Sequence, residues 1–299
     1  MTHILEACTD GAIASCTALI VSNPFDVMRT RFQIQGEMMK RGSYVARYKN
    51  LPQGMALVAK EEGVLALQKG FCAAALWQIT QNGIRIGMYP IVRDFVTRLT
   101  SRSHFLLDVL SAALCGVVGA VVSSPFVMLK TQLQADSVSS QTANSSAPKK
   151  GMWSTFRSIY HKGGVRGMWR GVTIAAQRTA VFSFSQLVSY DCAKRQVAPY
   201  CAPGLPTHIV ASTISSFCIV LCTSPFDVVM TRSYNRRSGA GPSTNNTLKL
   251  LWEIYKVEGV HGLYKGSTAM FSRTAPHTIV TFVTLEYLKS LKVKTPAAH

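Results

Sequence analysis

Acidic residues are scarce in this chain. Its 299 residues include 14 aspartates and glutamates against 32 lysines and arginines, which gives a net charge of +18. Charged residues make up only 15% of the chain and hydrophobic residues 47%, an unusual balance for a soluble globular protein. Because the basic residues lie in segments beside apolar runs, they indicate anionic lipid and an anionic ligand more simply than nucleic acid. We therefore expect a membrane protein without a nucleic-acid partner.

The chain also lacks the motifs of common enzyme classes. It contains no G-x-x-x-x-G-K-[ST], no G-x-G-x-x-G after a strand and no H-E-x-x-H. Its eight cysteines form no C-x-x-C pair and no metal-ligand spacing. We expect no catalytic site, no metal and no cofactor. The N-terminal residues have the features of neither a secretory signal nor a transit peptide, so any targeting must be internal.

Three related segments reveal an internal repeat. They read SNPFDVMRTR, SSPFVMLKTQ and TSPFDVVMTR, and their prolines, Pro24, Pro125 and Pro225, are 101 and 100 residues apart. A second motif follows each proline, reading EGVLALQKG, GGVRGMWRG and EGVHGLYKG. A regular period of this kind predicts a repeat architecture. We divide the chain into repeats at 1–100, 101–200 and 201–299, forming one structural domain.

Two helices in each repeat are expected to span a membrane. Val109 to Leu129 and Ile209 to Phe226 are uncharged and long enough to do so. Four more spans follow only from the repeat and carry polar residues, as helices that line a water-filled path must. These four are Ile4 to Pro24, Gly70 to Phe95, Thr173 to Ala193 and Thr268 to Leu291. The sequence thus predicts an all-α fold of six membrane helices.

The loops predict the orientation of the helices. Basic segments separate the two helices of each repeat, whereas the connections between repeats are short. By the positive-inside rule, the three basic loops share one compartment and both termini face the other. Within these loops, Ala135 to Gly151 and Arg236 to Asn246 have the Ser- and Asn-rich composition of flexible segments.

Each repeat proline is expected to kink its helix and to bring the charges beyond it together. Proline removes a helical hydrogen bond, so three equivalent kinks would close one end of the bundle. Charges buried in a membrane must find partners, and these can pair between helices. A single copy would be an ordinary kink beside solvated charges, but three copies in register indicate a common structure. The charged residues concerned are Asp26, Arg29, Lys130 and Asp227.

Pro-x-Asp/Glu-x-x-Lys/Arg, followed by Glu-Gly and an aromatic-basic-Gly, resembles the mitochondrial carrier family over almost the whole chain. The stretches QKGFCAAALWQITQNGIRIGMY and FSRTAPHTIVTF further resemble the oxaloacetate carriers and solute carrier family 25 members 34 and 35. The resemblance implies a pseudo-threefold, monomeric carrier of the mitochondrial inner membrane. It would have a short matrix-surface helix per repeat and both termini toward the intermembrane space. It also implies that cardiolipin binds at Gly70, Gly171 and Gly266, although a turn would explain these glycines equally well.

The family's cyclic pairing implies a matrix gate in which Asp26 meets Lys130 and Asp227 meets Arg29. Val127 then faces Met230, so an acid and a base are missing together. Replacing both members of a buried ion pair with apolar residues can be energetically neutral, unlike losing one. The glutamines one turn beyond the first two bases, Gln33 and Gln134, belong to the same predicted gate.

A second, cytoplasmic gate is implied near the ends of the other helices. Its pairs would be Asp191 with Lys289 and Glu286 with Arg93. Lys194 would lack a partner, because proline stands at position 90 where the family pattern has an acid.

Between the gates, the family pattern places the substrate site at Trp77, Arg178 with Thr179, and Arg273. Trp77, Gln81 and Arg85 share one helical face, which adds a third arginine. Few acids lie in the predicted spans to neutralise these arginines, Glu6 and Asp10 being the main candidates. An arginine fork suits a carboxylate through two parallel hydrogen bonds, so we expect a small di-anion. In the family's oxoglutarate carrier, arginine occupies the position of Trp77. The tryptophan therefore disfavours oxoglutarate as the substrate of this chain.

The sequence therefore predicts a secondary transporter rather than an enzyme. Its substrate would be a small di- or keto-carboxylate such as oxaloacetate, or another small di-anion such as sulfate. Two alternatives stay open at this stage. An uncoupling-type proton or anion leak would use the same fold and arginines, whereas a non-transporting scaffold would need no arginine-lined path.

Overall fold

The computed structural model of the chain describes residues 2–37, 39, 44, 46–100, 105–142, 151–200, 205–235 and 246–294. Within these ranges the fold is all-helical and has no strand. In chain order, the elements are α1 (Thr2–Ile34), α2 (Leu51–Glu62), the 3-10 helix η1 (Val64–Gln68), α3 (Phe71–Thr100), α4 (Phe105–Thr142), α5 (Met152–Met168), α6 (Val172–Val197), α7 (Leu205–Asn235), α8 (Thr247–Leu263) and α9 (Ser267–Lys294).

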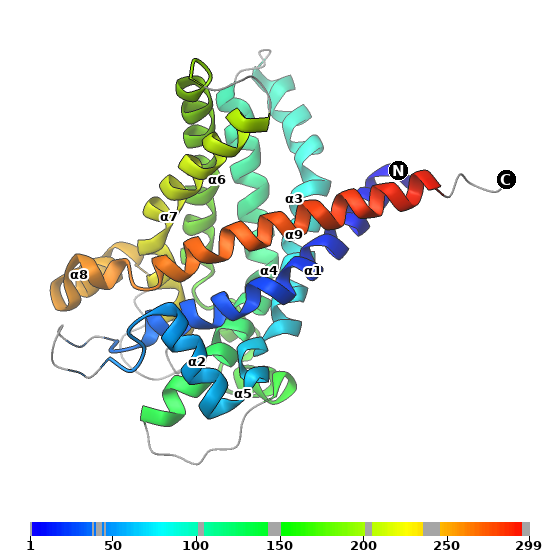
Figure 1. The fold of residues 1–299 in the computed structure, drawn as a ribbon. Helices are drawn as coiled ribbons and strands as arrows, with labels where there is room; N and C mark the ends of the chain where they lie inside the picture. The colour runs from blue at the N-terminus through cyan, green and yellow to red at the C-terminus, as the bar shows by residue number, and fades with distance from the viewer. Residues whose placement is uncertain are drawn as a thin grey trace.

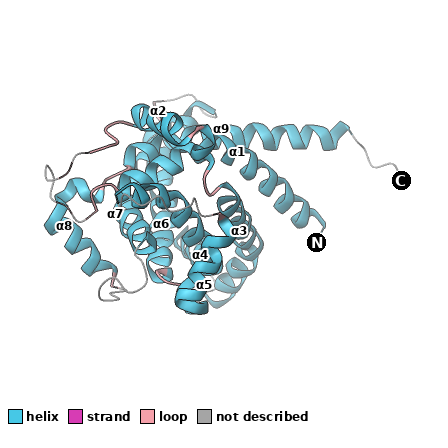
Figure 2. Cartoon of the chain, turned by 90° about the horizontal axis from the view of Figure 1, so that it is seen from below, coloured by secondary structure: helices cyan, strands magenta, loops and turns pink. Residues whose placement is uncertain are grey.

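The predicted all-α architecture is confirmed. Each repeat contributes two long helices separated by a shorter one, and the shorter helices are α2, α5 and α8. Helices α1 and α9 lie side by side, so the first and last repeats are neighbours in space (Figures 1 and 2). The first residues of α1 and the last of α9 lie at the same end of this pair (Figure 1). The three repeats therefore form one structure rather than a linear array.

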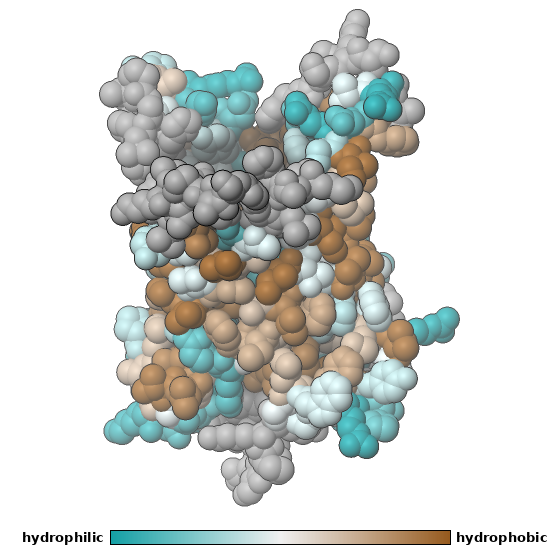
Figure 3. Space-filling model, turned by 90° about the vertical axis from the view of Figure 1, so that its right-hand side faces the viewer, coloured by the Kyte–Doolittle hydropathy of each residue, from teal (hydrophilic) through white to brown (hydrophobic). Residues whose placement is uncertain are grey.

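The outer surface of the bundle suits a lipid environment. Within the described residues, the first long helix of each repeat contains a segment long and apolar enough to cross a membrane: Thr9–Ile34, Leu107–Ala135 and Val210–Asn235. Figure 3 shows hydrophobic side chains across the middle of one face and hydrophilic ones toward both ends. Leu110 and Leu114 on α4 are each more than half exposed, as expected for side chains that face lipid.

The repeat prolines lie inside continuous helices and end none of them. Pro24, Pro125 and Pro225 are enclosed by α1, α4 and α7. One sequence expectation is wrong here, because the segment interpreted as a loop from Ala135 continues as helix to Thr142. No glycine or proline follows Pro125 before position 148, and adding residues to an existing helix costs little.

Glycines begin the second long helix of each repeat, where the chain turns from the surface helix into the bundle. Gly70, Gly171 and Gly266 all have φ between 74° and 83°, which strongly favours glycine. They also pack closely against the next repeat. A Cβ atom on Gly266 would stand 3.0 Å from the backbone oxygen of Arg29, and one on Gly70 would stand 3.3 Å from that of Lys130. These contacts support the turn interpretation of the three glycines.

Candidate functional site

Two buried ion pairs join the first long helices of the three repeats. Lys130 Nζ on α4 donates to Asp26 Oδ2 on α1 at 2.8 Å, and Arg29 Nη2 on α1 lies 2.7 Å from Asp227 Oδ1 on α7. All four side chains are at most 11% exposed. These are the two pairs that the sequence predicted. They connect α1 to both other repeats at the end of the bundle where the repeat prolines lie.

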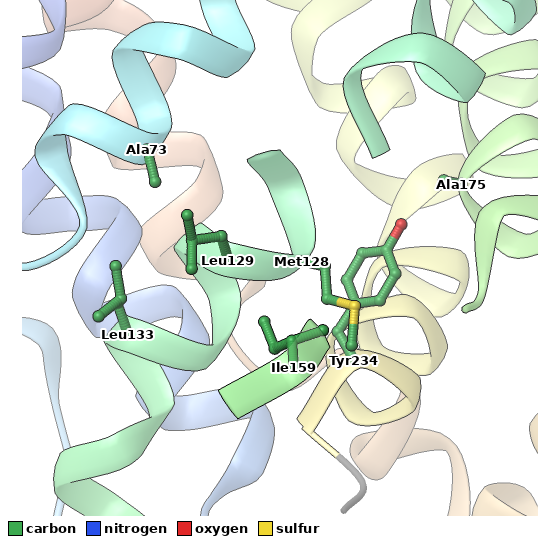
Figure 4. Close-up of a cluster of buried hydrophobic side chains, with 7 residues drawn as sticks. All are labelled: Ala73, Met128, Leu129, Leu133, Ile159, Ala175 and Tyr234. Carbon is green, nitrogen blue, oxygen red and sulfur yellow. The ribbon is translucent and has the colours of Figure 1, made fainter. Parts of the chain in front are cut away.

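The third equivalent contact between the first long helices of the repeats is apolar. Val127 and Met230 line the same cavity and pack against one cluster of buried side chains. Figure 4 shows the seven buried members of that cluster: Ala73, Met128, Leu129, Leu133, Ile159, Ala175 and Tyr234. Hydrophobic packing therefore occupies the position where the other two contacts are ionic.

Both arginines predicted to bind substrate contact the acids of these ion pairs. Arg178 on α6 donates through Nε to Asp227, and Arg273 Nη1 on α9 lies 3.2 Å from Asp26 Oδ1. The sequence named Glu6 and Asp10 as the main candidate partners, whereas the structure shows Asp227 and Asp26 in contact with these arginines, and the side chain of Glu6 lies outside the described residues. Sequence reasoning treated the gate and the substrate site separately, whereas the fold brings their charges together.

Charge is unbalanced in this cluster. Two carboxylates, Asp26 and Asp227, are surrounded by four permanently or normally cationic side chains, which leaves a net charge of +2. A further acid in ion-pair contact with the cluster is not found among the described residues. The cluster cations are Arg29, Lys130, Arg178 and Arg273. An anion that carries two negative charges would complete the neutralisation.

A cavity of about 40 Å³ lies at the cluster. Its lining consists of Asp26, Arg29, Thr30, Trp77, Val127, Lys130, Thr131, Gln134, Arg178, Met230, Thr231 and Arg273. Within the described structure, Nε of Arg29 and Nε of Arg273 are buried donors without a hydrogen-bond partner. Buried polar groups are normally paired, so these two N–H groups, like Asp227 Oδ2, have hydrogen-bonding capacity that the described conformation leaves unused.

Trp77 lies against Lys130, one of the cluster cations. Its indole Nε1 donates to Gln81 Oε1 at 3.0 Å, and the same oxygen accepts from Ser123 Oγ at 2.8 Å. Nζ of Lys130 lies 4.9 Å from the centre of the Trp77 ring, a distance that favours cation–π attraction. Gln81 therefore positions Trp77 and ties α3 to α4, and it is not itself part of the cavity lining.

Two other predicted substrate residues lie outside the cavity lining. Thr179 faces α4, where its methyl group would stand 3.0 Å from a Cβ on Gly116, and its hydroxyl donates to the carbonyl of Ala175. Arg85 lies two turns beyond Trp77 and donates to Gln186 Oε1 at 3.4 Å. No ion pair of Arg85 with an acid is found in the described part of the chain. It contributes further positive charge to the interior.

A second set of ion pairs, missed in the sequence, anchors the surface helices of repeats 1 and 3. Glu62 accepts from Arg31 at 2.9 Å, and Glu258 accepts from Arg232 at 2.9 Å. Lys69 and Lys265 contact the same carboxylates. The signal was available, since repeat 2 has Gln132 and Gly163 at these positions and so lacks acid and base together.

The predicted gate glutamines are buried and form hydrogen bonds across the repeats. Thr231 donates to Gln33 Oε1 at 2.7 Å, and Thr30 donates to Gln134 Oε1 at 2.9 Å. Each of these hydrogen bonds joins two repeats. The glutamines therefore reinforce the same closed end of the bundle.

At the opposite end, charged side chains form ion pairs that are partly or fully exposed. Arg93 Nε donates to Asp108 at 2.9 Å, and Asp191 pairs with Arg195 on its own helix at 2.8 Å. Lys194 is exposed. Exposed ion pairs contribute little stability. The predicted partners Glu286 and Lys289 have side chains outside the described part of the structure, so their pairing stays a prediction.

In the described part of the chain, the six long helices surround a cationic cavity, and buried ion pairs close one end. These features are those of a helical membrane transport protein. No cluster of three or more metal-ligating side chains occurs among the described residues. The family model for mitochondrial carrier proteins matches the chain three times, at residues 2–99, 101–200 and 202–295. The chain belongs to the mitochondrial carrier family, whose members are transporters of the mitochondrial inner membrane and not enzymes.

Relatives are similar over nearly their full length. The mitochondrial oxaloacetate transport protein of Saccharomyces cerevisiae is 36% identical, with 94% of this chain and 88% of the relative covered. Solute carrier family 25 member 35 of Homo sapiens is 32% identical over 93% of this chain and 96% of its own. Mitochondrial citrate transporter E of Aspergillus niger is 32% identical, with coverage of 91% and 88%.

Proposed function

We propose that this protein moves a small di-anion across the mitochondrial inner membrane by alternating access. The observation that carries the proposal is the cavity cluster with two carboxylates and four cations, whose net charge of +2 matches a di-anion. Relatives named for oxaloacetate and citrate transport favour a carboxylate. Oxaloacetate is therefore the first candidate, with other di- or keto-carboxylates and sulfate as the next.

Competition for two arginines would couple substrate binding to gate opening. In the described conformation, Arg178 and Arg273 contact the gate acids Asp227 and Asp26. The carboxylates of a substrate would accept hydrogen bonds from the same guanidinium forks. Each gate acid would then lose one of its two cations, which weakens the ion pairs that close the inner end. Alternating access in transporters moves elements around a fixed central site in this way.

The orientation and environment of the carrier complete the proposal. The closed end would face the matrix and both termini the intermembrane space, since the positive-inside rule predicts the basic loops on the matrix side. The cytoplasmic gate would close through Asp191 with Lys289 and Arg93 with Glu286, leaving Lys194 unpaired. A monomer would suffice, because the cavity is built within one chain. Cardiolipin would bind where α3, α6 and α9 begin, since helix N-termini attract phosphate.

Uptake of radiolabelled anions into proteoliposomes tests the proposal. The panel contains oxaloacetate, malate, malonate, sulfate and phosphoenolpyruvate. Arg178→Lys and Arg273→Lys should each reduce uptake at least about tenfold, because an ammonium cannot reproduce the two parallel hydrogen bonds of arginine. Arg157→Lys on surface helix α5 is the matched control and should transport normally.

Three outcomes would contradict the proposal. If the wild-type protein takes up none of the anions in the panel, a non-transporting scaffold would be favoured. Proton or anion conductance that is independent of the offered substrate would favour an uncoupling-type leak. Retained uptake in both cavity variants would show that Arg178 and Arg273 do not hold the substrate.

A further inference from the structure

His277 on α9 is a titratable group held in the interior of the bundle. Its ring nitrogen Nδ1 lies 3.1 Å from Ser22 Oγ on α1, and Nε2 lies 3.4 Å from Gln78 Nε2 on α3. Ser22 is fully buried and Gln78 is 7% exposed. The ring therefore bridges three helices and has a polar partner at each nitrogen. An ionisable side chain at such a position in a membrane protein is expected to have a function.

The charged groups around His277 belong to the cavity cluster. Arg273 lies one turn before it on α9, and Asp26 lies one turn beyond Ser22 on α1. Lys130 on α4 is the third charged group that acts on the ring. On α3, the partner Gln78 is neutral. Arg273 and Asp26 form an ion pair with each other at 3.2 Å, so the ring lies beside a contact that substrate would disturb.

The hydrogen bonds can accommodate either protonation state of the ring. As placed, the amide nitrogen of Gln78 is a donor, so Nε2 accepts and Nδ1 carries the proton toward Ser22 Oγ. If the Gln78 amide turns over, its oxygen faces the ring and accepts from a protonated Nε2. The Ser22 hydroxyl accepts from Nδ1–H in both states. Gaining a proton would then require only the rotation of one amide.

Electrostatics would link this proton to the anion. Without substrate, the cavity cluster already has a net charge of +2, which opposes another positive charge on His277. A bound di-anion removes that opposition. Coupling between two binding sites is reciprocal, so the protonated ring would favour the anion as much as the anion favours the protonated ring.

We propose that His277 binds the proton that travels with the anion, so that the carrier is a proton–anion symporter. This inference rests on the proposed function. The ring would take its proton from water at the outer side as the anion enters the cavity. It would return the proton to water at the matrix side when the anion leaves. One cycle would move about one proton with each anion, and the protein would return unchanged.

The test measures protons and anions together in proteoliposomes. Radiolabelled oxaloacetate reports anion uptake, and a pH-sensitive dye inside the vesicles reports proton entry. Wild-type protein should carry about one proton per anion, and His277→Gln should carry the anion with a proton ratio near zero. Glutamine keeps hydrogen-bonding groups for Ser22 and Gln78. The matched control His161→Gln, on surface helix α5, should keep the wild-type ratio.

A binding measurement covers the case in which His277→Gln does not transport. Sulfate serves as the probe because its charge is constant between about pH 5 and 8, where histidine titrates. Sulfate should stabilise solubilised wild-type protein against heat most strongly at low pH. Its affinity should fall by up to about tenfold per pH unit as the ring loses its proton. His277→Gln should show no such dependence, and His161→Gln should follow wild type.

Each outcome supports or overturns the proposal. A wild-type proton ratio in transporting His277→Gln, or an unchanged pH dependence of sulfate binding in that variant, would overturn it. Wild-type uptake without proton entry would do the same while leaving the anion carrier intact. Failure of wild type to transport or bind any anion would instead contradict the proposed function itself.

Discussion

Substitutions at Val127 and Met230 test whether an apolar contact takes the place of a third ion pair between the first long helices of the repeats. Both line the cavity whose cluster already has a net charge of +2. Met230→Arg adds a fifth cation without an acid, and an uncompensated buried charge costs about 3 to 5 kcal/mol. At roughly 2 °C per kcal/mol for a chain of this size, the unfolding midpoint of solubilised protein should fall by about 6 to 10 °C.

Val127→Asp should be less harmful than Met230→Arg, because its new carboxylate meets an excess of positive charge. It should nevertheless reduce anion uptake by lowering the net charge of the site. The double variant should recover at least about 1.5 kcal/mol relative to the sum of the single changes, as expected for residues in contact.

The control pair is Val127→Leu with Met230→Leu, which keeps both positions apolar and should cost less than about 1.5 kcal/mol. Thermal unfolding of all variants, followed in one detergent, gives the comparison. Additive effects in the charged double variant would show that positions 127 and 230 are not neighbours. The apolar-contact explanation would then be wrong.

Two further predictions concern stability and use the same unfolding assay. Gly266→Ala should lower the free energy of unfolding by at least about 1 to 2 kcal/mol, because φ is 83° and the new methyl group would crowd the Arg29 carbonyl at 3.0 Å. The control Gly163→Ala should be neutral or stabilising, because no atom lies within 4 Å of the Cβ atom that it adds. Glu62→Ala should cost about 3 to 5 kcal/mol by removing the acid that faces buried Arg31. Adding Arg31→Gln should recover part of that loss, as repeat 2 suggests, and no recovery would contradict the pairing.

Much of the architecture followed from the sequence because the signal is repeated. A motif that recurs about every 100 residues indicates three equivalent units, and each unit must bury an apolar helix surface. The same repetition places Asp26, Arg29, Lys130 and Asp227 at equivalent turns of three helices. The structure contains the two ion pairs that the resemblance to the family implied for these residues. Even the weak hydropathy of the second helices was expected of helices that line a polar path.

Tertiary structure decided which charges share a partner. Arg178 and Asp227 belong to different repeats, and so do Arg273 and Asp26, so no local pattern connects them. The bridge from His277 to α1 and α3 likewise spans distant segments. Helix periodicity determines the face on which a residue lies, but not which residue of another helix stands opposite. That depends on how far the helices tilt and slide when the whole bundle packs. In this fold the packing places the predicted substrate arginines against Asp26 and Asp227, the acids of the predicted gate.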